Sequence, residues 1–178
     1  MKPSLIAATF LIFVGAVLFF GFPVNIENGI LPKTEEPQTQ ASLPPPLKAP
    51  VSKKEPKASV LTREGILEWT SSNRRENGLN ILAGNEMLNS AAELKLKDMF
   101  FGQYFAHKSP DGKGASNFVE EESYKFLAVG ENLAMGDFED DKVLVDAWMN
   151  SPGHRANILD SKFTEIGIAA GRGKILDS

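Results

Sequence analysis

Hydrophobic positions divide this chain into three segments with different patterns. Residues 5–22, LIAATFLIFVGAVLFFGF, form an apolar run without a charged residue. Residues 27–60 are rich in proline, lysine, glutamate, glutamine and serine, and from Leu61 onward apolar residues recur at helical and then at strand intervals. The pattern predicts a signal anchor or signal peptide over 1–26, a disordered linker over 27–60 and one folded domain over 61–178.

The apolar run is long enough to cross a membrane as a helix, which takes about 20 residues and at least about 17. A cleaved signal peptide has a shorter apolar core, of roughly 7–15 residues, and then small residues at the cleavage site. The residues after the run, Phe22-Pro23-Val24-Asn25, lack that pattern. We therefore expect a transmembrane signal anchor with Lys2 in the cytoplasm and the domain outside the cell membrane. Cleavage, which would give a secreted protein, is the alternative.

The linker carries most of the 11 prolines of the chain. Proline fixes φ and removes a backbone donor, so neither helix nor sheet is expected there. The segment is predicted to be a semi-stiff, extended spacer that holds the domain away from the bilayer. A ligand for a proline-recognition domain is the alternative.

The hydrophobic pattern from Leu61 onward predicts an α+β fold, in which several helices enclose a small sheet. Thr62 and Asn85 are suitable N-cap residues, and apolar residues follow each of them at helical spacing. The expected helices begin after Thr62, after Asn85 and after Asp140 or Asp141, with a short one over 115–123; the expected strands lie near 101–107 and in FTEIGIAAG, 163–171. The helix after Asp140 or Asp141 is expected to stop at Ser151-Pro152-Gly153.

Charge and cysteine content restrict the function further. From Leu61 onward the chain has 13 Lys or Arg and 19 Asp or Glu, so the domain is acidic. Nucleic-acid binding needs a basic surface, and we therefore expect no nucleic-acid partner. Cysteine is absent, so the domain must be held by its core alone.

Three polar segments that read as loops contain the candidate chemistry: YFAHKSPDG, VGENLAMG and SPGHRANIL. They supply His107, Glu131 and His154, and these two histidines are the only ones in the chain. Neutral imidazoles suit Zn²⁺ or Cu²⁺, and a carboxylate could be a third ligand or a base acting on bound water. The alternative is that each histidine is a surface or hydrogen-bonded structural residue.

The motifs HKSPDG, GENLAMG, AWMNSPGHRANIL and FTEIGIA, in this order, closely resemble the CAP superfamily (cysteine-rich secretory proteins, antigen 5, pathogenesis-related 1). The resemblance covers residues 62–172 and is nearest to the bacterial, cysteine-free, SCP-like branch. It implies a three-layer α-β-α sandwich with a wide polar cleft on which two histidines and two glutamates converge, and in some members the cleft binds a divalent metal. His107 and His154 match the two histidines, which makes them the implied metal ligands, and Glu131 matches the first glutamate. Ser151 stands at the position of the second.

Other motif residues are expected to support the cleft rather than to react. Ser109 and Ser151 each precede a proline and read as turn residues. Asn132, Arg155 and Asn157 are expected to brace the loops by donating hydrogen bonds.

Family members continue after the EIGIA strand into one more strand, whereas this chain ends at Ser178. A missing last strand would leave an unpaired sheet edge, which is an aggregation hazard. A truncated product and a strand supplied by a partner are the two explanations.

Three functions remain open from the sequence. The first is a membrane-tethered extracytoplasmic module whose cleft binds a divalent metal such as Zn²⁺, a lipid, a peptide or a cell-wall ligand. The second is a metal-assisted hydrolase, similar to a peptidase, in which His154 or Glu131 acts as the base on surface or wall substrates. The third is a truncated copy without a function of its own.

Overall fold

The computed structural model describes residues 13–24, 43–48, 60–173 and 175 of the chain. Within them, five strands form one mixed sheet in the order β2-β4-β1-β5-β3. The strands are β1 (Phe13–Pro23), β2 (Leu47–Lys48), β3 (Ala83–Gly84), β4 (Phe126–Gly136) and β5 (Glu165–Gly173). The helices are α1 (Arg63–Glu76), α2 (Glu86–Phe101), α3 (Ala115–Glu121), α4 (Asp141–Met149) and α5 (Pro152–Ile158).

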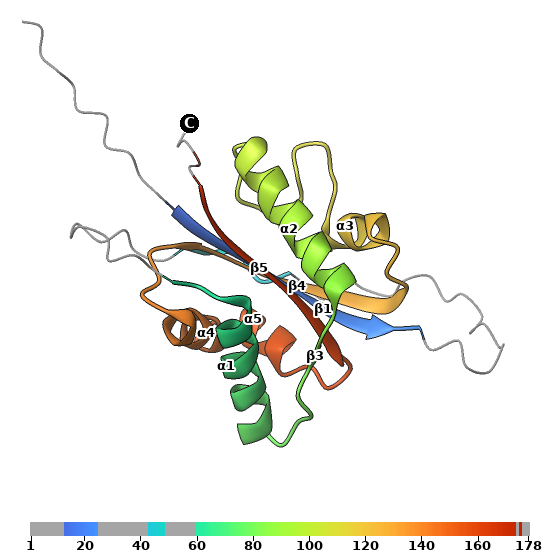
Figure 1. The fold of residues 1–178 in the computed structure, drawn as a ribbon, viewed down its shortest axis with the longest axis vertical. Helices are drawn as coiled ribbons and strands as arrows, with labels where there is room; N and C mark the ends of the chain where they lie inside the picture. Colours follow the sequence, from blue (N-terminus) through green and yellow to red (C-terminus); the bar gives the residue numbers. More distant parts are fainter. Residues whose placement is uncertain (1–12, 25–42, 49–59, 174, 176–178) are drawn as a thin grey trace, which may run out of the picture.

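The helices cover both faces of this sheet. In Figure 1, α2 and α3 lie on one side of the strands, and α1, α4 and α5 lie on the other. β1 runs antiparallel to both β4 and β5, while β2 and β3 are short edge strands that pair in parallel with β4 and β5. The predicted α+β class and the three-layer α-β-α sandwich are therefore confirmed.

Capping residues place the helices where the sequence predicted them. The Thr62 side chain accepts a hydrogen bond from the main-chain N–H of Gly65, and Asn85 accepts from the first turn of α2. Asp140 does the same for Val143 at the start of α4. After α1, Gly78 has a φ of +74°, a left-handed conformation that glycine adopts without strain.

The apolar run at the N-terminus differs most from its prediction. Its described part, Phe13–Phe22, lies in strand β1 at the centre of the sheet and not in a transmembrane helix. The physical reason is that a short apolar run without periodicity fits a strand buried on both faces as well as it fits a helix. Residues 1–12 lie outside the described residues. Of the helices in the described ranges, none is both long and apolar enough to span a bilayer.

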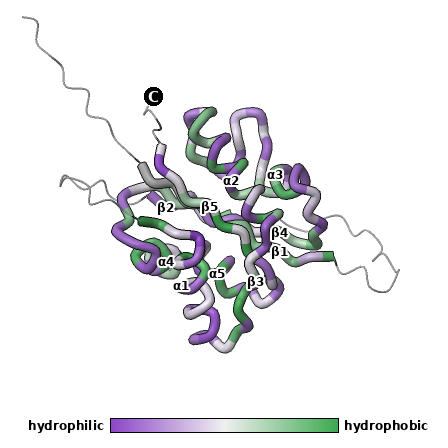
Figure 2. The backbone as a smooth tube through the Cα atoms, viewed as in Figure 1, coloured by the Kyte–Doolittle hydropathy of each residue, from purple (hydrophilic) through white to green (hydrophobic). Residues whose placement is uncertain are grey.

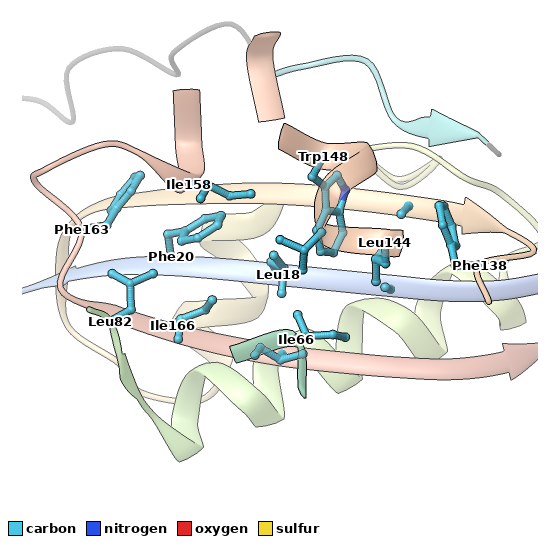
Figure 3. Packing of buried hydrophobic residues seen from close by; sticks show 14 residues of the cluster. Leu18, Phe20, Ile66, Leu82, Phe138, Leu144, Trp148, Ile158, Phe163 and Ile166 are labelled. Carbon is cyan, nitrogen blue, oxygen red and sulfur yellow. The ribbon is translucent and has the colours of Figure 1, made fainter. Parts of the chain in front are cut away.

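Alternate residues of β1 contribute to the two cores of the sandwich. Leu18 and Phe20 point toward α4, α5 and the loop after it, where they pack with Trp148, Ile158 and Phe163 (Figure 3). Val17 and Phe19 belong to the other core, which α2 and α3 cover. Figure 2 shows hydrophobic stretches along the strands in the middle of the molecule and hydrophilic stretches in the outer loops and in parts of the helices. The alternation of side chains along a strand explains how one segment serves both layers.

In the described sheet β1 fills the position between β4 and β5, while the outer edges of β4 and β5 pair only with the two-residue strands β2 and β3. β1 pairs with β4 from Val14 to Pro23 and with β5 from Phe13 to Gly21. An N-terminal segment of the same chain thus provides the pairing that the sequence reading assigned to a missing C-terminal strand or to a partner.

Three further local predictions were wrong. The strand expected near 101–107 is not formed, because α2 continues to Phe101 and a loop follows. The GENLAMG segment is not a loop but belongs to β4, which carries Glu131 and Asn132. His154 lies on a helix and not in a turn, since Ser151 is the N-cap of α5 and Pro152 occupies its first turn. Proline is favoured there because the first turn of a helix needs no N–H from it.

Candidate functional site

Three separate elements bring the sequence-predicted residues together beside the outer edge of β4. Glu131 lies in β4, His107 lies in the loop that follows α2, and His154 lies on α5. The side chains of Glu131 and His154 are fully buried, and that of His107 is 11% exposed. The fold therefore assembles the polar residues of three motifs that are far apart in the sequence.

His107 contacts an oxygen atom at each ring nitrogen. Its Nδ1 lies 2.5 Å from Oε2 of Glu131, and its Nε2 lies 2.6 Å from the main-chain oxygen of Pro44. A carbonyl oxygen can only accept a hydrogen bond, so Nε2 must carry a proton. Nδ1 then either donates to a Glu131 carboxylate or accepts from a protonated Glu131. In both arrangements the His107–Glu131 pair is neutral overall and presents an N–H donor at Nε2.

The surroundings of Glu131 act on its proton in opposite directions. Burial raises the pKa of Glu131, while the hydrogen bond from His107 and the charge of Lys95 lower it; burial is the largest effect, and the pKa lies above its ordinary value. Burial therefore favours retention of the proton that the pair shares.

Lys95 is a buried cation next to this pair, which sequence reasoning missed. Its Nζ donates to the main-chain oxygen of His107 and to the hydroxyl of Tyr104, both at 3.1 Å. Burial lowers the pKa of Lys95, and the carboxyl groups of Glu131, Asp98 and Asp111 oppose that change. A signal existed in the sequence, since Lys95 occurs at helical spacing from Leu88, Ala91 and Ala92, on the face predicted to be apolar. A charge on such a face suggests a buried partner.

His154 is buried in a different way from His107. Its Nδ1 lies 2.8 Å from the hydroxyl of Ser151, and within the described residues its Nε2 is buried without a hydrogen-bond partner. Burial lowers the pKa of His154 to about 4, the charge of His107 lowers it further, and the nearby main chain of Leu133 acts in the opposite direction. His154 is therefore neutral at pH 7.

Two asparagines link the elements that carry the site. Asn132 donates to the main-chain oxygen of His154 at 3.1 Å. Asn157 donates to the main-chain oxygen of Glu131 at 3.1 Å and to the side-chain oxygen of Asn132 at 2.9 Å. These bonds hold α5 against β4 and fix the relative position of Glu131 and His154.

The other predicted supporting residues lie further from the pair. Ser109 is buried in its turn, where its hydroxyl bonds to Asp111 and accepts from the main-chain N–H of Lys113. Arg155 is exposed and donates to Asn77 at 3.1 Å. Glu165 of β5, which was not among the predicted site residues, accepts hydrogen bonds from Asn85 and Tyr124.

Residues Leu43–Lys48, here called the strap, lie over the histidine site. The strap comes from the linker, for which the sequence predicted no sheet, yet Leu47 and Lys48 pair in parallel with Ala134 and Met135 of β4. Pro44 is buried, and its oxygen faces His107. The three prolines precede the paired residues, so the ladder uses positions that still have an N–H group. The resemblance implied a wide polar cleft at this position. In the described structure, the strap lies there against His107 and β4.

The divalent metal that the resemblance implied does not fit the site while the strap is in place. Both nitrogens of His107 are engaged, and Nε2 carries a proton that a metal ligand must lose. Over the described ranges, no group of three or more His, Cys, Asp or Glu side chains is arranged to hold a metal ion. His154 Nε2 and Glu131 Oε1 are the buried polar atoms of the site that lack a partner in those ranges.

Comparison with known proteins agrees with this architecture. The chain is 38% identical over 103 residues to the uncharacterized protein YkwD of Bacillus subtilis (strain 168), a match that covers 58% of this chain and 40% of YkwD. It is 30% identical over 125 residues to the uncharacterized membrane protein YlbC of the same strain, covering 70% of this chain and 36% of YlbC.

A solved structure supports the same assignment. The crystal structure of an extracellular protein containing a SCP domain from Bacillus anthracis str. Ames matches with a TM-score of 0.55 and 31% identity, over 58% of this chain and 35% of that one. The chain thus spans two fifths or less of the length of the relatives it matches. Residues 68–175 match the model of the cysteine-rich secretory protein family, CAP, and the chain belongs to that family.

Proposed function

We propose that this chain is an extracytoplasmic CAP-domain binding module that holds a polar ligand, without reacting with it, at His107, Glu131 and His154. The observation that carries the proposal is the pair of contacts at the His107 ring. Its Nδ1 faces a carboxyl group and its Nε2 faces a carbonyl oxygen, so Nε2 is a hydrogen-bond donor. A ligand oxygen can accept from that donor in the position where the Pro44 oxygen lies.

A hydrolase is the second candidate, because the Ser151 hydroxyl lies 2.8 Å from Nδ1 of His154, as in a nucleophile–base pair. Two features argue against it. The pKa of His154 is lowered to about 4, which makes it a weak base at neutral pH. A catalytic histidine is also normally held by a carboxylate, whereas the groups that lie against His154 in the described residues are the Ser151 hydroxyl and the Leu133 main chain.

The proposed location outside the cytoplasm is supported by the names of relatives. The similar structure from Bacillus anthracis is described as that of an extracellular protein, and YlbC as a membrane protein. The acidic domain suits a cell-wall, lipid or peptide ligand better than a nucleic acid.

Binding at this site can be tested with the full chain and three probes: soluble cell-wall fragments, vesicles of zwitterionic phospholipid, and zinc chloride. Two histidines give two imidazole signals in a nuclear magnetic resonance spectrum, so each probe can be assigned to a site. We expect a wall or lipid probe to shift the His107 signal and, at 100 times its Kd, to stabilise the fold by about 2.7 kcal/mol.

The variant His107→Ala should abolish that shift in stability, and His107→Gln, which retains a donor, should restore part of it. Lys108→Ala, at the exposed neighbouring position, is the matched control and should bind as the parent does. Cleavage of the wall fragments by the parent chain, lost in His107→Ala, would contradict the binding role and favour the hydrolase. Stabilisation by zinc alone, lost in both His107→Ala and His154→Ala, would make the two histidines a metal site.

A further inference from the structure

The strap occupies the histidine site as a bound peptide would. We propose that Leu43–Lys48 is an internal ligand that keeps the site closed, and that the external ligand is an extended, proline-containing polypeptide that displaces it. This inference rests on the proposed binding function and specifies its ligand. The group that faces Nε2 of His107 is a main-chain carbonyl and not a side chain.

The register of the strap places its prolines beside the site. Leu47 pairs with Ala134 in a parallel ladder, so a strand continued backwards by three residues brings Pro44 opposite Glu131. The bond from His107 to the Pro44 oxygen agrees with that register. An added strand at the edge of a sheet is a general mode of peptide recognition, in which main-chain bonds give affinity and side-chain positions give specificity.

The polar groups of the site suit a polypeptide with proline at this position. His107 offers a donor, and Pro44, Pro45 and Pro46 offer carbonyl acceptors but no N–H group. A residue with an N–H group at position 44 would bring a further donor, which would itself need an acceptor in this partly buried place. Proline also restricts the free chain to extended forms, so less conformational entropy is lost on binding.

A glycine gives the proline ring its space. A Cβ atom at Gly153 of α5 would lie 2.4 Å from Cβ of Pro44, and the three nearest atoms to it all belong to Pro44. The absence of a side chain at Gly153 therefore forms a cradle that fits this ring. Gly153 lies in the first turn of α5, where alanine is compatible with the helix.

The contacts that hold the strap are few enough to be displaced. They include the bond to His107, a ladder of two residues, the burial of Pro44 against Gly153 and the packing of partly buried Leu47 on the core. The strap belongs to the same chain as the site, and a segment linked to its binding site has an effective local concentration that reaches the millimolar range. A free peptide must compete with that concentration, so the intact chain should bind it weakly and a chain with a weakened strap should bind it well.

The test uses the full chain and a fluorescent peptide with the sequence of residues 41–50, ASLPPPLKAP, with binding measured by anisotropy. Pro44→Asp places a carboxylate in a buried position beside Glu131 and should open the strap. Pro45→Asp makes the same change at an exposed neighbour and is the matched control. We expect the apparent Kd of the peptide to fall about tenfold or more in Pro44→Asp and to stay unchanged in Pro45→Asp.

A second substitution tests whether the peptide binds where the strap does. Gly153→Ala, added to Pro44→Asp, should abolish peptide binding, because its Cβ fills the cradle. Gly84→Ala is the control, since its Cβ would meet only Leu67, at an ordinary 3.8 Å. In the absence of peptide, amide hydrogen exchange at Leu47 and Lys48 should accelerate at least about tenfold in Pro44→Asp and in Gly153→Ala alone, while a cooperative melt verifies that each variant is folded.

Equal affinity of the parent and Pro44→Asp for the peptide would overturn the inference, and so would peptide binding that survives Gly153→Ala. Failure of the peptide to bind Pro44→Asp would also overturn it. If wall fragments or vesicles still shift the His107 signal in that case, the proposed function stands and only the polypeptide ligand is wrong. If they do not, both proposals fail.

Discussion

The two histidines differ in what surrounds their ring nitrogens, and this difference determines where charge resides in the site. His107 is hydrogen bonded at both nitrogens, and its partner Glu131 is buried. His154 is fully buried beside a serine hydroxyl, in a place where a charge would be costly. The ionisable groups that share a proton are therefore His107 and Glu131, next to the buried cation of Lys95.

The neutral state of His154 predicts a loss of stability in acid. Its pKa in the folded chain is about 4, below the ordinary value of 6.5, so between these values the unfolded chain binds a proton that the folded chain does not. This group stabilises the fold fully above pH 6.5, and the contribution is lost as the pH falls toward 4. Between pH 7 and pH 5 the loss should be about 2 kcal/mol in the free energy of unfolding.

Urea unfolding of the full chain at several pH values measures this effect, with His154→Gln as the comparison. The variant lacks the titrating group, so its stability should fall by about 2 kcal/mol less over the same range. Equal pH dependence of parent and variant would mean that the pKa of His154 is the same in the folded and the unfolded chain.

At the scale of single elements, the helices could be predicted from the sequence because their signals are local. Thr62, Asn85 and Asp140 each cap a helix within three residues of themselves, and apolar spacing follows each cap. The candidate site was found for a similar reason, since both histidines and Glu131 lie in recognisable motifs. Pro44 was missed because its contact with His107 joins segments that are far apart in the sequence, whereas Lys95 was missed although its position on the apolar face of α2 gave a signal.

The strands were harder to predict for a physical reason. β4 carries buried Glu131 and Asn132 among glycines, so its central part reads as a polar loop. β1 reads as a membrane helix because an apolar run does not reveal which apolar surroundings it will find. Its strand partners lie more than 100 residues away in the chain, and no local pattern indicates such a pairing.

One contact between elements sets how closely α2 packs on the sheet. A Cβ atom at Gly167 of β5 would lie 2.1 Å from the main-chain carbon of Leu88 in α2. The variant Gly167→Ala should therefore push α2 away from the sheet and cost about 3 kcal/mol of unfolding free energy. Gly84→Ala in β3, which meets only a side chain at 3.8 Å, should change it by less than about 1 kcal/mol. Chemical denaturation of the two variants measures the difference in their free energies of unfolding. Equal values would contradict the close packing of α2 on β5.

For the whole molecule, the position of β1 means that the two ends of the sequence are joined in one sheet. β1 lies between β4 and β5 and supplies residues to both cores. Its partners in β4 and β5 lie more than 100 residues later in the sequence, so this part of the sheet cannot be completed until β5 has been made. Pairings between such distant segments make folding slow relative to that of proteins with local contacts. The same segment was predicted to be a membrane anchor, so its role can be decided by removing it.

A chain of residues 27–178 lacks β1 and should not fold cooperatively. Val17, Leu18, Phe19 and Phe20 are each 0% exposed, and burial of such side chains contributes roughly 1.5–3 kcal/mol apiece. Their sum is comparable to the whole stability of a typical domain, which is about 5–15 kcal/mol. Loss of β1 would also leave β4 and β5 with unpaired main-chain groups along their facing edges.

The control is a chain of residues 12–178, which keeps all of β1 and removes most of the rest of the apolar run. Thermal and urea unfolding should show a cooperative transition in this control that matches the full chain, and none in residues 27–178. If residues 27–178 instead unfold with the midpoint and urea dependence of the full chain, β1 is not part of the domain that melts. The charge-free run over 5–22 would then be available to a membrane, and β4 and β5 would need another partner between them.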